Sequence, residues 1–157
     1  MKAKKVRPAN RRFTDSDRNQ SLQQIDGKNW GEPTLNTHVV KECHRLRQIP
    51  LCRFTIEDLR LAIGQSMGLE YLVPLALERL RDDPLAEGAY YPCDLLVNVL
   101  GVDQEFWKRN SELRDQTAAI AEQAFALFPD VPDIANSIVT KVVHKAYNAF
   151  RKCLEIE

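Results

Sequence analysis

Apolar residues recur every three or four positions along most of the chain, which is the period of an α-helix. In the central stretch, residues 54–96, Ile56, Leu59 and Ile63 fall on one helical face. After Gly64 and Gly68 the pattern resumes with a longer apolar stripe, formed by Leu69, Leu72, Val73, Ala76 and Leu80. A stripe of this width is typical of a helix that packs on a core. The stretch therefore predicts two packed helices and, from about residue 93, the start of a third.

Local signals mark the ends of these two helices. Thr55 is followed three residues later by Asp58, a carboxylate variant of the capping box that opens the first helix. Pro74 interrupts the second helix, and an interior proline costs about 3 kcal/mol unless it lies in the first turn or at a kink. Whether residues 68–73 form a separate turn stays open, and we interpret Pro74 as a packing kink.

The same period predicts a short helical turn, three further helices and a last one. Ser21 with Gln24 forms a capping box that opens a short turn before Gly27. The other three run from Asn36 or Thr37 to about Arg47, from Cys93 or Asp94 to Leu100, and from Asp103 to about Leu127. A last helix has Asp133 in its first turn and apolar residues on one broad face as far as Leu154. The two carboxy-terminal helices are predicted to form an antiparallel pair.

No segment alternates between polar and apolar residues as an exposed strand does. We predict an all-α fold of about six helices in a single orthogonal or bundle-like domain, with two long carboxy-terminal helices. The domain is expected to span residues 20–157. Residues 1–19 are expected to form a basic, disordered tail, because they have few apolar groups to bury.

The amino-acid composition is that of an ordinary globular protein. Its 157 residues are enough for one domain with a sizeable core, and 28% of them are charged. No apolar run approaches the roughly 20 residues that a membrane span needs, and no apolar segment follows the basic amino terminus as in a signal peptide. We therefore expect a cytoplasmic protein that does not associate with membranes.

The net charge of zero hides an asymmetry between the amino terminus and the rest of the chain. Residues 1–18 hold seven basic and two acidic side chains, which leaves the body with a net charge of about −5. An acidic body favours a basic partner and argues against broad phosphate binding, so no direct nucleic-acid contact is expected.

The four cysteines form no CxxC pair, and we expect reduced thiols packed as small apolar side chains. His38, Cys43, His44 and Cys52 cluster in sequence, but they lack the short paired spacings of a zinc site. We therefore predict no metal and no cofactor. Trp30, next to Gly31 and Pro33, is predicted to pack against the core rather than to stack on a ligand.

Motifs of enzymes are missing from the chain. It holds no GxSxG, no HExxH and no GxxxxGK[ST], and adjacent acids such as Glu57 and Asp58 suit helix capping better than acid and base catalysis. Asp82 and Asp83 are interpreted as solvated rather than as magnesium ligands. A helix-turn-helix DNA reader is disfavoured because no predicted helix has a basic face.

Several long phrases in the first two thirds of the chain are those of a known family. They read SLQQIDGKNWGEP, PLCRFTIEDLRLAIGQ, GLEYLVPLALERL and DPLAEGAYYPCDLL, between about residues 21 and 100. This part of the chain resembles the immunity proteins of bacterial contact-dependent growth inhibition (CDI) systems. The resemblance implies a cytoplasmic protein that binds and blocks a toxin domain, often a nuclease, at the carboxyl terminus of a large secreted CDI protein.

The loop after the second central helix is the predicted working surface. From residue 82 to residue 94 it holds four carboxylates and two tyrosines, without a lysine or arginine. Tyrosine is enriched at binding hot spots, and carboxylates suit the basic cleft of a nuclease. The candidate toxin-binding residues are Glu78, Asp82, Asp83, Glu87, Tyr90, Tyr91 and Asp94. In the alternative interpretation the tyrosines pack on the core and the acids are solvated.

Three functions remain open on the sequence alone. The first is a toxin-neutralising binding protein, the second is a nucleic-acid-binding regulator that uses the basic tail, and the third is a hydrolase without a recognised motif. The resemblance favours the first of these, which is not an enzyme.

Overall fold

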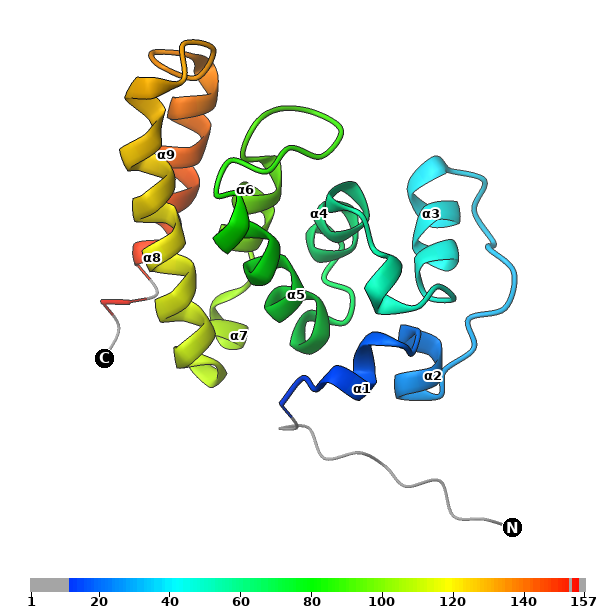
Figure 1. The fold of residues 1–157 in the computed structure, drawn as a ribbon. Coiled ribbons are helices and arrows are strands. Elements are labelled where there is room, and N and C mark those ends of the chain that lie inside the picture. The colour runs from blue at the N-terminus through cyan, green and yellow to red at the C-terminus, as the bar shows by residue number, and fades with distance from the viewer. Residues whose placement is uncertain (1–11, 153, 156–157) are drawn as a thin grey trace. The chain divides into compact units, whose positions relative to one another are not determined.

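The computed structural model describes residues 12–152, 154 and 155. Every regular element in these residues is a helix, which confirms the all-α prediction (Figure 1). The chain divides into two compact units, Met1–Phe54 and Thr55–Glu157. Residues 1–11 of the predicted tail lie outside the described residues, and the single domain from residue 20 onward stays a prediction.

The first unit consists of short helices with well-formed ends. Its elements are α1 (Asp15–Arg18), α2 (Leu22–Asp26), α3 (His38–Leu46) and the 3₁₀ turn η1 (Leu51–Arg53). The predicted capping box opens α2, because the Ser21 hydroxyl accepts from the Gln24 amide while the Gln24 side chain accepts from the Ser21 amide. Within the segment that the sequence assigned to the tail, α1 is a helical turn with Asp17 buried.

Trp30 lies against α3 but stays half open to solvent. Its ring meets the His44 ring edge to face, at 5.3 Å between centroids, and the Arg47 guanidinium lies 4.5 Å from the indole centroid. Arg47 also donates to the Asp26 carboxylate and to the Lys28 carbonyl, both at 2.7 Å. These contacts fix the segment between α2 and α3, while 46% of Trp30 remains exposed.

The second unit is built around one short buried helix. Its elements are α4 (Ile56–Gly64), α5 (Leu69–Asp82), α6 (Asp94–Leu100), α7 (Gln104–Arg109), α8 (Ser111–Leu127), the 3₁₀ turn η2 (Phe128–Asp130) and α9 (Ile138–Arg151). Helix α6 packs against α4, α5, α8 and α9 (Figure 1). Its side chains Leu95, Leu96 and Val99 are inaccessible to solvent. Because α6 begins at Asp94, the loop before it starts from the centre of this unit.

Helix α5 is continuous through Pro74. It starts after Gly68, whose backbone is left-handed at φ +49°, so residues 69–73 belong to the same helix as Pro74 and form no separate turn. On its buried face lie Leu72, Val73, Ala76, Leu77 and Leu80. Burial of this face offsets the local cost of the proline.

Two predicted helix boundaries are wrong. The single helix from Asp103 to Leu127 is divided into α7 and α8 at Asn110, whose backbone is not helical and whose side chain donates to the Phe106 carbonyl at 2.8 Å. The last helix starts at Ile138 after Ser137 as N-cap, and not around Asp133. Between η2 and α9, residues 131–136 form a tight turn that ends with Asn136 at φ +61°.

The predicted antiparallel pair of carboxy-terminal helices is present. Phe125 of α8 stacks on His144 of α9 at 4.3 Å, and Glu122 accepts a hydrogen bond of 2.6 Å from Tyr147. One helix steps back three residues as the other steps forward three, which is the register of antiparallel neighbours. Burial and the Glu122 hydrogen bond raise the pKa of Tyr147 to about 12. No helix in the described part of the chain combines the length and the apolar character that crossing a bilayer requires.

Candidate functional site

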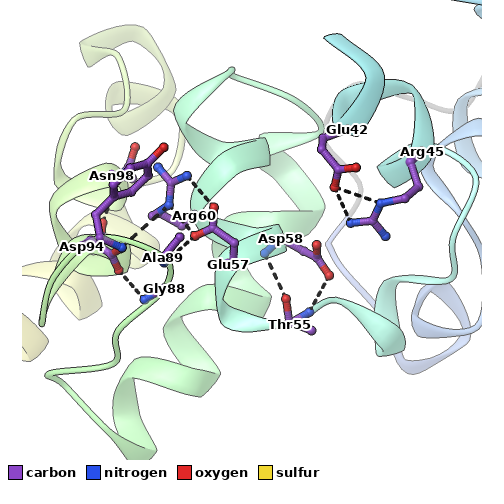
Figure 2. A network of polar contacts seen from close by, with 11 residues as sticks. Glu42, Arg45, Thr55, Glu57, Asp58, Arg60, Gly88, Ala89, Asp94 and Asn98 are labelled. Carbon is purple, nitrogen blue, oxygen red and sulfur yellow. Dashed lines mark hydrogen bonds and ion pairs between the residues drawn. The ribbon is translucent and has the colours of Figure 1, made fainter. Parts of the chain in front are cut away.

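The loop between α5 and α6, residues 83–93, is tied down by the first residue of α6. The side chain of Asp94 is 1% exposed, and its two oxygens accept from the amides of Gly88 at 2.6 Å and Tyr90 at 3.1 Å. Figure 2 shows the bond to Gly88 and the Asn98 side chain beside it. A buried carboxylate with two backbone donors fixes the loop without a hydrophobic core of its own.

A second carboxylate, from α4, holds the loop from its other side. Glu57 accepts from the amide of Ala89 at 2.8 Å and receives two hydrogen bonds of 2.6 Å from Arg60 (Figure 2). The Arg60 hydrogen bonds, assisted by the Ala89 amide, lower the pKa of Glu57. Thr55 and Asp58 form the predicted capping box at the start of α4, which orients this first turn.

Arg60 joins the two carboxylates to the most exposed aromatic ring of the loop. Its side chain is 12% exposed, its Nε lies 3.9 Å from an Asp94 oxygen, and its guanidinium lies 4.5 Å from the centroid of Tyr90. The hydrogen bonds to Glu57 raise the pKa of Arg60, so the cation persists at every physiological pH. Tyr90 is 70% exposed, and the cation beneath its ring restrains it where it projects into solvent.

The two ends of the loop are also fixed by hydrogen bonds. Asp83 caps the turn after α5 by accepting from the Leu85 amide at 3.0 Å, and the Cys93 amide donates to the Leu85 carbonyl at 3.1 Å. Cys93 is fully buried and left-handed at φ +70°. Burial, with Asp83 and Asp94 nearby, raises the pKa of its thiol to about 12, so the thiol is neutral and inert at neutral pH.

Comparison with known proteins identifies the family to which the chain belongs. A model of the family of CDI immunity proteins matches residues 24–117, which include α4, the α5–α6 loop and α6. The chain belongs to the family of CDI immunity proteins. No curated protein and no solved structure matches the chain.

In this immunity protein the predicted toxin-binding residues divide into two sets. The outer set offers side chains at the surface, and the inner set is buried or half-buried. Asp82, Asp83, Glu87 and Tyr90 are exposed on or beside the loop, and Glu78 is half-buried in α5. Asp94 is buried and bonded to the loop backbone, so it serves the loop's structure.

Tyr91 also belongs to the inner set. It is half-buried, and burial raises the pKa of its hydroxyl.

Two residues of the site were missed by sequence reasoning. Glu57 was interpreted only as a capping acid, and Arg60 was not considered, although acid and base three residues apart on a helix signal a side-chain pair. The segment itself lacks a basic residue, but α4 supplies one beneath Tyr90. The local charge is therefore less acidic than the sequence of the loop alone indicates.

The expectation that no helix has a basic face is also wrong. Three lysines, Lys141 and Lys145 on α9 and Lys152 at its C-cap, line a groove together with His144 and Asn148. All five residues are exposed. Their spacing of three, four and seven residues places them on one side of the helix.

The immunity protein offers no grouped metal ligands in the described part of its chain. No three side chains of His, Cys, Asp or Glu lie close enough there to hold an ion. Cys43 is buried and Cys52 is exposed, while His44 faces Trp30 and the Gly31 carbonyl. Cys153 lies outside the described residues.

Proposed function

We propose that this immunity protein binds and blocks a cognate CDI toxin domain in the cytoplasm of the cell that produces both. The toxin domain is the carboxy-terminal part of a large secreted CDI protein, and we propose that it is a nuclease. The family match over residues 24–117 is the observation that carries the proposal. The protein acts by occupying its partner stoichiometrically and not as an enzyme.

The proposed toxin-binding surface is the α5–α6 loop with the adjoining end of α5. Asp82, Asp83 and Glu87 provide three exposed carboxylates, and Tyr90 provides an exposed ring among them. A nuclease must attract phosphates, so the cleft that it offers is basic and complementary to such a surface. A tyrosine that enters the cleft contributes contact area at a small entropic cost.

The anchoring of the loop supports this choice of surface. Ordering a flexible loop on binding costs free energy, roughly 0.5–1.5 kcal/mol for each immobilised side chain. Here Glu57 and Asp94 hold three consecutive amides of the loop, those of Gly88, Ala89 and Tyr90, before any partner arrives. A surface fixed in advance keeps more of its interaction energy for the complex.

Charge reversal at the three outer acids tests the surface. Asp82→Lys, Asp83→Lys and Glu87→Lys together are expected to slow association with the toxin domain about 10-fold or more at low salt. The difference should shrink above about 0.5 M salt, where the screening length falls to a few ångströms. Association rates are measured by surface plasmon resonance, with far-UV circular dichroism as the check on folding.

A matched control separates this surface from net charge. Glu32→Lys, Asp130→Lys and Asp133→Lys change the total charge equally at exposed sites elsewhere, and this variant should bind the toxin domain with little change in rate. Equal slowing in both variants would reject the loop as the site. Failure of the unaltered protein to bind the toxin encoded beside it, or to protect a cell that produces it, would reject the function itself.

A further inference from the structure

The exposed side of α9 carries a basic groove that the proposed function does not use. The groove has a volume of about 600 Å³ and is lined by Lys141, His144, Lys145, Asn148 and Lys152, among others. It lies outside the residues that match the family, which end at residue 117. The α5–α6 loop contributes nothing to its lining.

The side chains along the groove are cations and hydrogen-bond donors. Helix α9 contains no aspartate or glutamate, and the lining residues include no carboxylate. Within the described chain, no ion pair joins Lys141, Lys145 or Lys152 to an acid. The nearby acid on α8, Glu122, accepts from the Tyr147 hydroxyl. The groove therefore presents uncompensated positive charge to a ligand.

The spacing of the lysines suits a ligand with repeated negative charges. Along the helix axis, Lys141 and Lys145 are about 6 Å apart and Lys145 and Lys152 about 10 Å apart, from the rise of 1.5 Å per residue. One strand of duplex nucleic acid carries a phosphate about every 3.4 Å of axis, so the 16 Å row of lysines faces several phosphates. The amide of Asn148 adds a neutral donor of the kind that contacts phosphate oxygens.

The groove lacks an open aromatic ring on which a base could stack. One face of the His144 ring is covered by Phe125, which stacks on it at 4.3 Å with an interplanar angle of 5°. The lining includes no tyrosine, tryptophan or phenylalanine on which a base could stack, and no arginine that could bind guanine in the bidentate way. Contacts from this surface therefore go to the sugar–phosphate backbone.

We propose that the α9 groove binds the sugar–phosphate backbone of nucleic acid without regard to its sequence. This proposal departs from the sequence-based expectation of no nucleic-acid contact, which rested on the acidic charge of the body and on the expectation that no helix has a basic face. It involves other residues than the toxin-binding proposal and does not depend on it. The ligand is recognised through its row of phosphates by the three lysines.

Titration of a fluorescent 20-nucleotide single-stranded RNA with the full-length protein tests the groove. If three phosphates are neutralised, the slope of log K against log salt is about −2, at roughly −0.7 for each contact on a single strand. Lys141→Glu, Lys145→Glu and Lys152→Glu together should weaken binding at least about 10-fold at low salt. A duplex DNA of equal length, as a second probe, should bind with a slope of about −3, since each duplex contact contributes roughly −0.9.

The control keeps the change in charge but moves it elsewhere. Lys41→Glu, Arg53→Glu and Arg109→Glu alter exposed cations outside α9, and this variant should retain most of the RNA affinity. A neutral set, Lys141→Gln, Lys145→Gln and Lys152→Gln, should lose affinity as well, and it serves in place of the reversal if that variant fails to fold.

Three results would overturn the proposal. These are lysine variants that bind RNA as tightly as the parent, a control that loses as much affinity as they do, and a labelled poly-glutamate peptide that binds the groove as tightly as the RNA does. The last result would identify an acidic protein surface as the partner instead. Protection against the toxin is expected to be unchanged in the lysine variants, so the outcome is independent of the proposed function.

Discussion

Gly88 lies where the backbone of the α5–α6 loop passes between two carboxylates. A methyl group added there would lie 2.6 Å from one oxygen of Glu57 and 3.1 Å from both oxygens of Asp94. Neither acid is free to move away, because Glu57 is bonded to Arg60 and Asp94 is buried. Glycine is required at this position because the two carboxylates leave no room for a side chain.

Gly88→Ala is therefore expected to lower the free energy of unfolding by about 1–3 kcal/mol, the usual cost of overpacking. It should also weaken toxin binding, because the loop loses its fixed shape. The measurement is urea unfolding followed by circular dichroism. As a control, Gly101→Ala places its methyl group in ordinary contact, 3.4 Å from the nearest atom, and should change stability by less than about 1 kcal/mol. Equal stability of the two variants would contradict this account of the loop.

The lowered pKa of Glu57 links the stability of the site to pH. In the folded protein its pKa lies below the ordinary value of 4.5, so the unfolded chain binds more protons in the acid range. The stabilisation is complete above pH 4.5 and is lost as the pH falls through the folded pKa. The Glu57 contacts are thus present throughout the neutral range.

Glu57→Gln should accordingly be less stable than the parent at neutral pH, and the difference should shrink as the pH falls below about 4.5. Unfolding free energies from urea titrations between neutral and acid pH measure it. Asp133→Asn, at an exposed site in the turn before α9, provides the comparison and should follow the parent at every pH. A Glu57→Gln difference that stays constant with pH would show that the hydrogen bonds act without the charge.

At the scale of elements, local chemistry predicted the starts of three helices that carry their own caps. Ser21, Thr37 and Thr55 each accept from the amide three residues ahead, and the helices that they open start where the sequence placed them. Cap and helix are neighbours in sequence, so no tertiary contact is needed to predict them. The same holds for α6, which ends before Gly101 as predicted.

The error at Asn110 occurs where a tertiary contact competes with a local pattern. The division at Asn110 places Trp107, a fully buried residue, against Phe150 at 5.4 Å while its indole donates to the Val102 carbonyl. If residues 104–127 formed one straight helix, the axis of α8 would set the direction of the Trp107 side chain, and the contact with Phe150 would not. Nothing in the residues around Asn110 reveals this, because the partner, Phe150, lies more than forty residues away in sequence.

Substitution of Pro74 tests whether the packing of α5 outweighs the low helix propensity of proline. Proline in this interior position removes one backbone hydrogen bond and crowds the preceding turn, and the helix is continuous nevertheless. Pro74→Ala should raise the free energy of unfolding by about 1–2 kcal/mol. The gain in helix propensity, about 3 kcal/mol, is reduced by the greater entropy of the unfolded chain and by lost contacts of the ring.

Urea unfolding of the Pro74→Ala protein measures this gain. Leu69→Ala, at the half-buried start of the same helix, is the control for a change in side-chain size, and it should not stabilise the protein. A loss of stability in Pro74→Ala would show that the proline shapes the face on which Leu72 and Val73 are buried.

At the scale of the whole molecule, the sequence predicted the exposed acids and the exposed tyrosine of the α5–α6 loop, but not the contacts that hold the loop in place. Its exposed acids and Tyr90 were named from composition, because charge and residue type are visible in sequence. The contacts of Glu57 and Arg60 were not, because these residues precede the loop by more than twenty positions and only the packing of α4 on α6 brings them to it. The role of Asp94 was missed for the same reason, since burial is decided by the helices around α6.

The net charge of zero conceals a segregation of charge within the second unit. Asp82, Asp83 and Glu87 form one exposed acidic group beside the α5–α6 loop, and the lysines of the α9 groove form a basic one. The two groups share no residue. If each binds its own partner through contacts, the effects of changing them should be independent.

The two triple reversals, combined in a single protein, test this separation. The loop variant, Asp82→Lys, Asp83→Lys and Glu87→Lys, should lose toxin association and keep its RNA affinity, or increase it slightly by long-range attraction. The groove variant, Lys141→Glu, Lys145→Glu and Lys152→Glu, should show the reverse pattern. In the combined variant, which restores the net charge to zero, the binding free energy lost with each partner should match the loss in the corresponding triple variant within about 0.5 kcal/mol. Recovery of either affinity in the combined variant would show that both partners respond to the overall field of the protein and not to two separate sites.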